Sequence, residues 1–183
     1  MRMKADILGD KDSVAAVELY DKAADIVMKT KGKPDIAMMW NSSLHLLRTR
    51  DFKRGWECWE LGFAKEVGTM GRNLIPQVKV LPRADKNKDF NPEHWTLVVV
   101  EQGIGDQILF LSVMEEAIKE FKNIFLIVEL RMKSIIERSF PNVQVGLPGL
   151  LESWPSNSLK KNGYIPLGSL PGRYRQSVES FKN

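Results

Sequence analysis

The chain contains a single cysteine, Cys58, and only two histidines, His45 and His94, among its 183 residues. One cysteine excludes a disulfide within the chain, and so few histidines and cysteines do not supply the ligand spacing of a zinc site. We therefore expect no metal site and no covalently bound cofactor. Because disulfides are typical of secreted proteins, the sequence also favours a reducing compartment, the cytoplasm.

Long apolar runs are also missing. No stretch approaches the roughly 20 apolar residues that a membrane-spanning helix needs, and residues 1–6 lack the apolar core of a signal peptide. The 27 Lys and Arg against 23 Asp and Glu leave a net charge of only +4. That balance suits an anionic ligand but falls short of the basic surface typical of nucleic-acid binding. We expect a soluble protein with no membrane span and no nucleic-acid partner.

Residues 1–72 are predicted to be helical. Apolar residues recur with helical spacing in three segments, namely 13–30, 35–49 and the residues after Asp51. Asp12 or Ser13 can cap the first helix, and the order Lys31-Gly-Lys-Pro34 is typical of a helix end. The short connection at 48–51 predicts that the second and third helices pack antiparallel.

Four aromatic residues fall on these helices: Trp40, Trp56, Trp59 and Phe63. Burial preferences favour packing between helices as their role, and a peptide-binding groove is the alternative. Three prolines then interrupt every regular pattern, at Pro76, Pro82 and Pro92. We expect 73–94 to be an exposed linker, with a short edge strand at 77–81.

Residues 95–183 alternate between strand and helix patterns. The run of β-branched and aliphatic residues at 96–100 predicts a buried strand, Gly103 and Gly105 predict a turn, and Asp106 is expected as the N-cap of an amphipathic helix at 107–121. Further strands are expected at 124–129, 143–147 and 164–167, with a helix at 130–140. This order predicts an α/β fold with a parallel sheet.

In a parallel sheet, ligands bind beyond the carboxyl ends of the strands, which places Glu101 to Asp106 at the expected mouth. The turn lacks a complete dinucleotide-binding fingerprint because residue 108 is Ile, and it has no P-loop lysine. A nucleotide-binding oxidoreductase is therefore disfavoured, with Glu129 as the one candidate for holding a ribose. A purely structural glycine turn is the alternative interpretation.

Two resemblances sharpen this picture. The segment from Asn41 to Glu60, which ends in Asp-Phe-Lys-Arg-Gly-Trp-Glu-Cys-Trp-Glu, resembles a tetratricopeptide repeat, with Ser43, Gly55 and Gly62 as candidates for the small residues at its helix crossing. Three later segments occur in the order found in tetratricopeptide-repeat proteins whose C-terminal part is similar to heptosyltransferases and related GT-B glycosyltransferases. They are Glu101-Gln-Gly-Ile-Gly-Asp-Gln-Ile108, Phe140-Pro-Asn-Val143 and Ile165-Pro-Leu-Gly-Ser-Leu-Pro171.

The resemblance implies tetratricopeptide-like helical hairpins at 1–72, a linker at 73–94, and a Rossmann-like domain at 95–183 that forms the acceptor side of a GT-B fold. It implies Asp106 as the general base that activates an acceptor hydroxyl. The other residues implied at the acceptor site are Glu101, Gln102, Gly103, Ile104, Gly105, Gln107 and Ser169.

A GT-B enzyme binds its nucleotide sugar on a second domain, which residues 1–183 do not contain, so the chain alone is expected to be inactive. Its expected partners are a sugar acceptor and a separate donor domain, and exposed apolar surface would favour a homo-oligomer. The alternative function is a non-catalytic module of tetratricopeptide type that binds a protein or a sugar.

Overall fold

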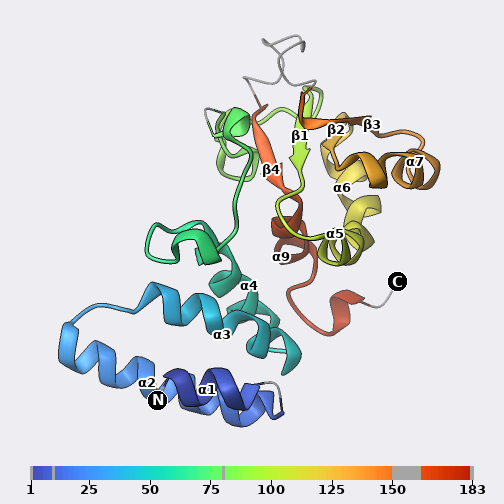
Figure 1. Cartoon of the computed structure of the whole chain (residues 1–183). Helices are drawn as coiled ribbons and strands as arrows, with labels where there is room; N and C mark the ends of the chain where they lie inside the picture. Colours follow the sequence, from blue (N-terminus) through green and yellow to red (C-terminus); the bar gives the residue numbers. More distant parts are fainter. Residues whose placement is uncertain (1, 10, 80, 150–161, 182–183) are drawn as a thin grey trace. The chain divides into compact units, whose positions relative to one another are not determined.

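The computed structural model describes residues 2–9, 11–79, 81–149 and 162–181. The chain divides into two units: unit 1 comprises Met1–Arg72 and Gly172–Asn183, and unit 2 comprises Asn73–Pro171. Unit 1 is built from helices, whereas unit 2 combines helices with a parallel sheet (Figure 1). The fold is therefore mixed α/β, as the sequence predicts. None of the helices in the described segments is long and apolar enough to cross a membrane.

Four helices form the body of unit 1: α1 (Arg2–Gly9), α2 (Ser13–Lys31), α3 (Ile36–Arg48) and α4 (Phe52–Glu60). Asp12 caps α2 by accepting a hydrogen bond from the backbone N–H of Ala15, and Gly32 ends the helix at φ 65°. The helix α1 was not expected from the sequence, because eight residues give too few apolar positions to establish a period.

The core of unit 1 depends on small residues and aromatic rings. A Cβ added at Gly55 would lie 2.7 Å from Leu47 Cδ2, so glycine allows α3 and α4 to approach closely. The rings of Trp40 and Trp59 pack against each other at a tilt of 35°, with centroids 4.7 Å apart. Arg72 is buried beside them and is paired with Glu60 Oε1 at 2.8 Å. These contacts agree with the predicted packing role of the aromatic residues.

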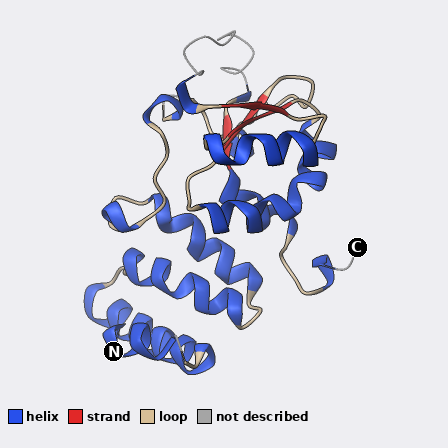
Figure 2. Cartoon of the chain, turned by 45° about the vertical axis from the view of Figure 1, so that its right-hand side comes forward, coloured by secondary structure: helices blue, strands red, loops and turns tan. Residues whose placement is uncertain are grey.

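The described part of unit 2 contains four parallel strands, with every neighbouring pair in parallel register: β1 (Thr96–Val99), β2 (Ile124–Ile127), β3 (Gln144–Gly146) and β4 (Tyr164–Pro166). Their order across the sheet is β3-β2-β1-β4, and Figure 2 shows the strands gathered in one sheet. All of β1 is buried, which is the environment that its unbroken run of β-branched and aliphatic residues requires.

The helix expected at 107–121 is in fact two helices, α5 (Ile104–Phe110) and α6 (Met114–Phe121), separated by the 3₁₀ turn Leu111–Val113. The expectation that Asp106 is the N-cap was wrong, because Gly103 occupies that position and Asp106 lies in the first turn. The buried face also differs, since Gln107 is buried while Ile108 is 58% exposed. The remaining helices are α7 (Leu130–Ser139) and α9 (Leu170–Tyr174), which spans the division between the units.

Residues 73–94 belong to unit 2 and pack against its sheet, which differs from the exposed linker expected from the prolines. Val78 and Ala84 are buried, and the N–H of Tyr164 donates to Pro82 O at 3.0 Å. The fully buried side chain of Asn162 adds hydrogen bonds to Asn91 O and His94 O. The edge strand expected at 77–81 is absent from the described residues there, where Pro76–Val78 forms a 3₁₀ turn.

Candidate functional site

The strand order places a candidate site at one edge of the sheet. The chain runs from β1 through α5 and α6 to β2 on one side, whereas β4 joins β1 from the other side. In such sheets the point where the order reverses leaves a crevice beyond the carboxyl ends of the strands. We call the residues there the carboxyl edge: 100–107 after β1, 128–131 after β2 and 167–169 after β4.

Glu101 joins the segments that follow β1 and β4. Its carboxylate oxygens accept hydrogen bonds from the backbone N–H of Gly168, at 3.1 and 3.4 Å. The next residue, Ser169, is held from another side, because Arg83 Nη2 donates to its Oγ at 3.4 Å. Arg83 is itself fixed by Asp85, with two nitrogen–oxygen distances of 2.8 and 2.7 Å. Hydrogen bonds within unit 2 thus hold both Glu101 and Ser169, two residues expected to contact a ligand.

Gln107 joins the segments that follow β1 and β2. Its Nε2 donates to Gln102 O at 2.7 Å and to Glu129 Oε1 at 3.3 Å. The side chain is 1% exposed, so the expected ligand contact of Gln107 is not available at the surface. Its Oε1 atom has no hydrogen-bond partner among the described residues. A buried acceptor without a donor destabilises a fold by about 1–3 kcal/mol.

Glu129 carries a fixed negative charge beside Gln107. Its Oε2 atom pairs with Arg131 Nη2 at 2.9 Å. The hydrogen bonds from Arg131 and then from Gln107 lower the pKa of Glu129 below its ordinary value, because both stabilise the ionised form. The side chain stays 41% exposed, so this carboxylate remains open to a ligand.

The glycine turn itself is open to solvent. A Cβ added at Gly105 would meet nothing within 4 Å, and one at Gly103 would meet only Asp106 Oδ2, at 3.6 Å. Neither glycine has a positive φ. Backbone geometry and packing therefore do not require glycine at either position, whereas close approach of a ligand to the backbone would. Asp106 is exposed, and no hydrogen bond or ion pair joins its side chain to a described residue.

The structure therefore brings the expected residues 101–107 together with Ser169, through the bond between Glu101 and Gly168. Sequence reasoning missed Arg83, Asp85 and Arg131, and it weighed Glu129 only as a ribose ligand. The position directly after a buried parallel strand was the available signal for Glu129. No sequence signal marks Arg83, because its contact with Ser169 joins residues 86 positions apart.

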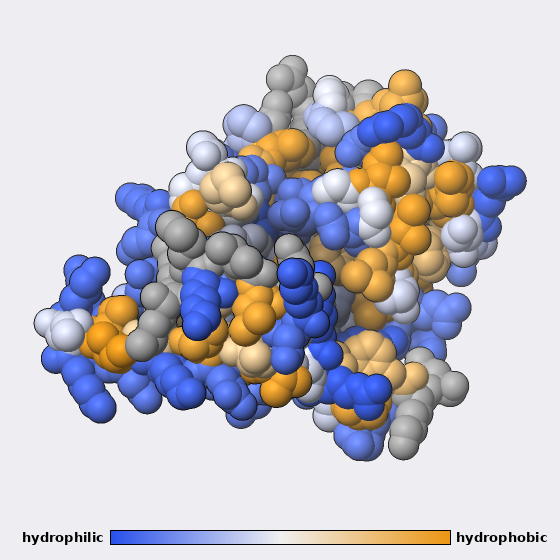
Figure 3. Space-filling model, turned by 60° about the horizontal axis from the view of Figure 1, so that its bottom comes forward, coloured by the Kyte–Doolittle hydropathy of each residue, from blue (hydrophilic) through white to orange (hydrophobic). Residues whose placement is uncertain are grey.

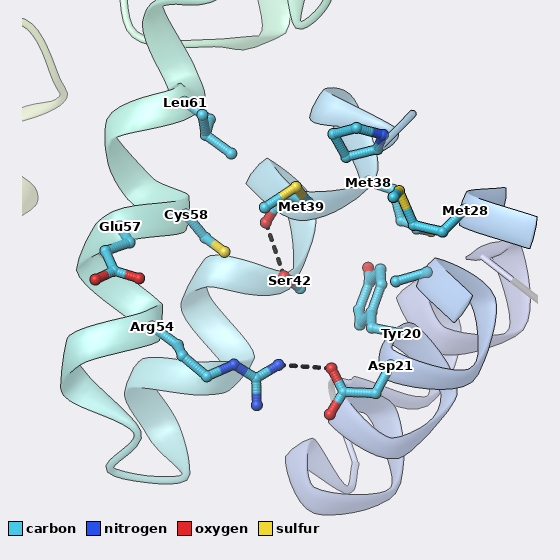
Figure 4. Close-up of a pocket in the computed structure, with 12 residues that line it drawn as sticks. Tyr20, Asp21, Met28, Met38, Met39, Ser42, Arg54, Glu57, Cys58 and Leu61 are labelled. Atoms are coloured by element: carbon cyan, nitrogen blue, oxygen red, sulfur yellow. Dashed lines mark hydrogen bonds and ion pairs between the residues drawn. The ribbon is translucent and has the colours of Figure 1, made fainter. Parts of the chain in front are cut away.

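A second candidate site lies within unit 1. A cavity of about 470 Å³ opens between α2, α3 and α4, and its apolar lining includes Met28, Met38 and Met39. Figure 4 shows Cys58 on α4 and Leu61, directly after α4, facing it, and the ion pair between Arg54 and Asp21 at its margin. Cavities of this size with an apolar lining and a few polar groups are typical of ligand sites.

Sulfur-containing, uncharged side chains make up much of the lining of this cavity. Ser42 donates to Met39 O at 2.7 Å, and burial raises the pKa of the Cys58 thiol, so that the thiol stays protonated at neutral pH. Methionine side chains adapt to partners of irregular shape. In the described part of the chain, no group of three or more Cys, His, Asp or Glu is placed to hold a metal ion.

Comparison with known proteins finds one informative similarity. The chain is 28% identical over 126 residues to protein FlbA of Caulobacter vibrioides. The match covers 66% of this chain but 20% of FlbA, so the chain spans about a fifth of the length of this curated relative. No protein-family model matches the chain, and neither does any solved structure.

Proposed function

We propose that unit 2 is the acceptor side of a GT-B-type glycosyltransferase, Rossmann-like in fold and related to the heptosyltransferases. The observation that carries this proposal is the strand order β3-β2-β1-β4, which matches the first four strands of a Rossmann sheet. It puts the segment from Glu101 to Asp106, which carries the sequence resemblance, at the reversal of strand order. Unit 1 would then be a tetratricopeptide-like helical extension of this cytoplasmic protein.

In this proposal Asp106 is the general base. Its carboxylate takes the proton of an acceptor hydroxyl while the hydroxyl oxygen attacks the anomeric carbon of the donor sugar. The bond from that carbon to the nucleotide diphosphate breaks, and the diphosphate leaves with the bonding electron pair. The exposed position of Asp106 and the open space around Gly103 and Gly105 support this role, because an acceptor can approach both the carboxylate and the backbone.

The donor sugar has to come from elsewhere. The described residues contain one parallel sheet, and the resemblance assigns the nucleotide sugar to a second Rossmann-like half. We therefore propose that a donor-binding half is the functional partner of unit 2. The 183-residue chain alone should neither transfer nor hydrolyse a nucleotide sugar, and measured turnover that Asp106→Asn abolishes would overturn the need for that partner.

Acceptor binding can be tested without the donor half. Titration of the ¹⁵N-labelled chain with methyl glycosides of glucose, galactose and mannose should shift the backbone amide signals of 103–106 in a saturable way. Asp106→Asn should weaken that binding, whereas Asp89→Asn, an exposed carboxylate in unit 2, serves as the matched control. Unchanged signals at 103–106 with all three sugars would contradict the proposed function.

The cavity in unit 1 favours a second candidate function, a non-catalytic module that binds an apolar side chain of a protein partner. Its lining by Met28, Met38 and Met39 supports this alternative. Peptides selected from a random library for binding to the chain should lose affinity when Ala24→Phe fills the cavity, and should bind Ala64→Phe, which lies outside the lining, as before. Peptides that bind both variants equally would exclude the cavity as the binding site.

Self-association is a further part of the proposal. Exposed aliphatic side chains occur on both units, among them Leu44 on α3 and Leu109 on α5. On the face drawn in Figure 3, hydrophobic residues stand in several groups among hydrophilic ones. Covering such surface favours an oligomer. Light scattering over a range of concentrations should show a dimer or larger species, and a constant monomer mass would count against it.

A further inference from the structure

Gln107 is an unusual residue to bury at this point. An aliphatic side chain of similar size would fill the same space without burying polar atoms, yet the amide is 1% exposed and its oxygen has no partner among the described residues. A buried polar group of this kind requires an explanation. The hydrogen bonds of its nitrogen offer an explanation, because Nε2 donates to both Gln102 O and Glu129 Oε1.

The ion pair of Glu129 with Arg131 does not account for the presence of a glutamate at this position. Arg131 follows Glu129 by two residues and is 74% exposed, and exposed ion pairs of this type add little to stability. Glu129 nevertheless has one oxygen held by Gln107 and the other held by Arg131. The two contacts fix the direction of a carboxylate that is still 41% exposed at the carboxyl edge.

Exposed aliphatic residues lie next to both members of this pair in the sequence. Gln107 and Glu129 are each followed in the chain by an exposed aliphatic residue, Ile108 at 58% and Leu130 at 73% exposure. A sugar ring has the complementary pattern, because its hydroxyl groups lie around the edge while its C–H bonds form an apolar face. A fixed carboxylate provides two strong acceptors for such hydroxyls.

The geometry points to a sugar subsite at Glu129 and Gln107, in which Glu129 accepts hydrogen bonds from hydroxyls on neighbouring carbons of the acceptor ring. Gln107 is a positioning residue that fixes Glu129 relative to the turn at Gln102 and does not itself contact the ring. Ile108 and Leu130 contact the apolar face of the ring. This inference rests on the proposed function, because it takes the acceptor to be a sugar, and it adds a contact distinct from Asp106.

The test follows the side-chain amide signal of Gln107 in the ¹⁵N-labelled chain during titration with the methyl glycosides of glucose, galactose and mannose. At least one of them should shift this signal together with the backbone amides of 103–106. Glu129→Gln keeps the shape of the side chain but removes its charge, and should weaken binding about tenfold. The matched control is Glu137→Gln, a carboxylate on α7, the helix that Glu129 precedes, which pairs with Lys133 at 3.1 Å.

The outcomes separate this subsite from the proposed function. Shifts at 103–106 without a shift at Gln107, together with unchanged affinity of Glu129→Gln, would overturn the subsite and leave the proposed function intact. A shift at Gln107 without shifts at 103–106 would support the subsite and contradict the role of Asp106. If neither the Gln107 signal nor the signals of 103–106 shift with any of the three glycosides, both the subsite and the proposed function are overturned. Arg131→Ala provides a second variant, expected to reduce affinity because it releases one oxygen of Glu129.

Discussion

Glycine has opposite roles in the helix crossings of unit 1 and at the carboxyl edge of unit 2. In unit 1 a Cβ at Gly62 would lie 2.5 Å from Trp40, and one at Gly71 would lie 2.2 Å from Gly62 O. At the carboxyl edge, a Cβ at Gly105 would meet nothing within 4 Å. The first glycines are explained by the chain itself. No contact among the described residues requires glycine at position 105. This difference separates glycines needed for packing from glycines that leave space for a ligand.

The largest effect is expected at Gly163, which extends the comparison to a closed glycine within unit 2. It has a φ of 85°, and a Cβ there would lie 2.0 Å from Pro82 O. Gly163→Ala should lower the free energy of unfolding by about 3–4 kcal/mol, because strain and a backbone clash add together. Urea denaturation would measure the loss. A change below about 1 kcal/mol would show that the segment at Pro82 moves easily.

A smaller loss is expected at the helix crossing of unit 1. Gly62→Ala pushes a methyl group against the ring of Trp40 and the stem of Arg72, both of which can shift in part. The expected destabilisation is about 1–3 kcal/mol. Tryptophan fluorescence during denaturation would report it, since Trp40 packs against Trp59. An unchanged midpoint would remove Gly62 from the group of glycines that packing requires.

The opposite sign is expected for Gly105→Ala. Replacing glycine by alanine within α5 should stabilise the fold by about 0.5–1 kcal/mol, because it reduces the freedom of the unfolded chain and meets no neighbour. The same methyl group should weaken binding of methyl glycosides if the space belongs to a ligand. Thermal denaturation and sugar titration of this one variant measure the two effects. A variant that is more stable and binds sugars as before would refute the role of the open glycine.

The smallest effect concerns pH. The folded pKa of Glu129 lies below its ordinary value, chiefly because of Arg131 and then Gln107. Its stabilising contribution is therefore present above the ordinary glutamate pKa and is lost as the pH falls through the lowered folded value. Wild type should be slightly more stable than Glu129→Gln at neutral pH, and the two urea midpoints should converge in acid. A difference that persists in acid would point to packing rather than charge.

The sequence predicts the framework of unit 2 well because its signals are local. The run at 96–100 consists of β-branched and aliphatic residues that suit burial on both faces, so a buried strand is the favoured structure. The glycines that follow mark the carboxyl end of this strand. The helix after the turn could not be predicted in detail. The apolar period continues through 111–113, where the chain forms a 3₁₀ turn, and Gln107 breaks the rule that polar residues face solvent.

The parts that escaped prediction depend on distant contacts. Three prolines between 73 and 94 are typical of a linker, yet the side chain of Asn162 binds Asn91 and His94 and holds that segment on the sheet. Nothing near Asn162 in the sequence marks it as such a residue. The grouping of Gly172–Asn183 with unit 1 is similar, since Trp56 Nε1 donates to Arg175 O across 119 positions.

The hydrogen bond between Glu101 and Gly168 also determines when the carboxyl edge can form during synthesis of the chain. Its two residues are 67 positions apart, and β4 pairs with β1 rather than with the strand made just before it. During synthesis the ribosome must therefore release β4 before Glu101 meets its partner. A nascent chain that ends before β4 can form the pairing of β1 with β2, but its glycine turn faces an unfinished sheet. Ligand binding should appear abruptly with chain length, once residue 169 has left the ribosomal tunnel.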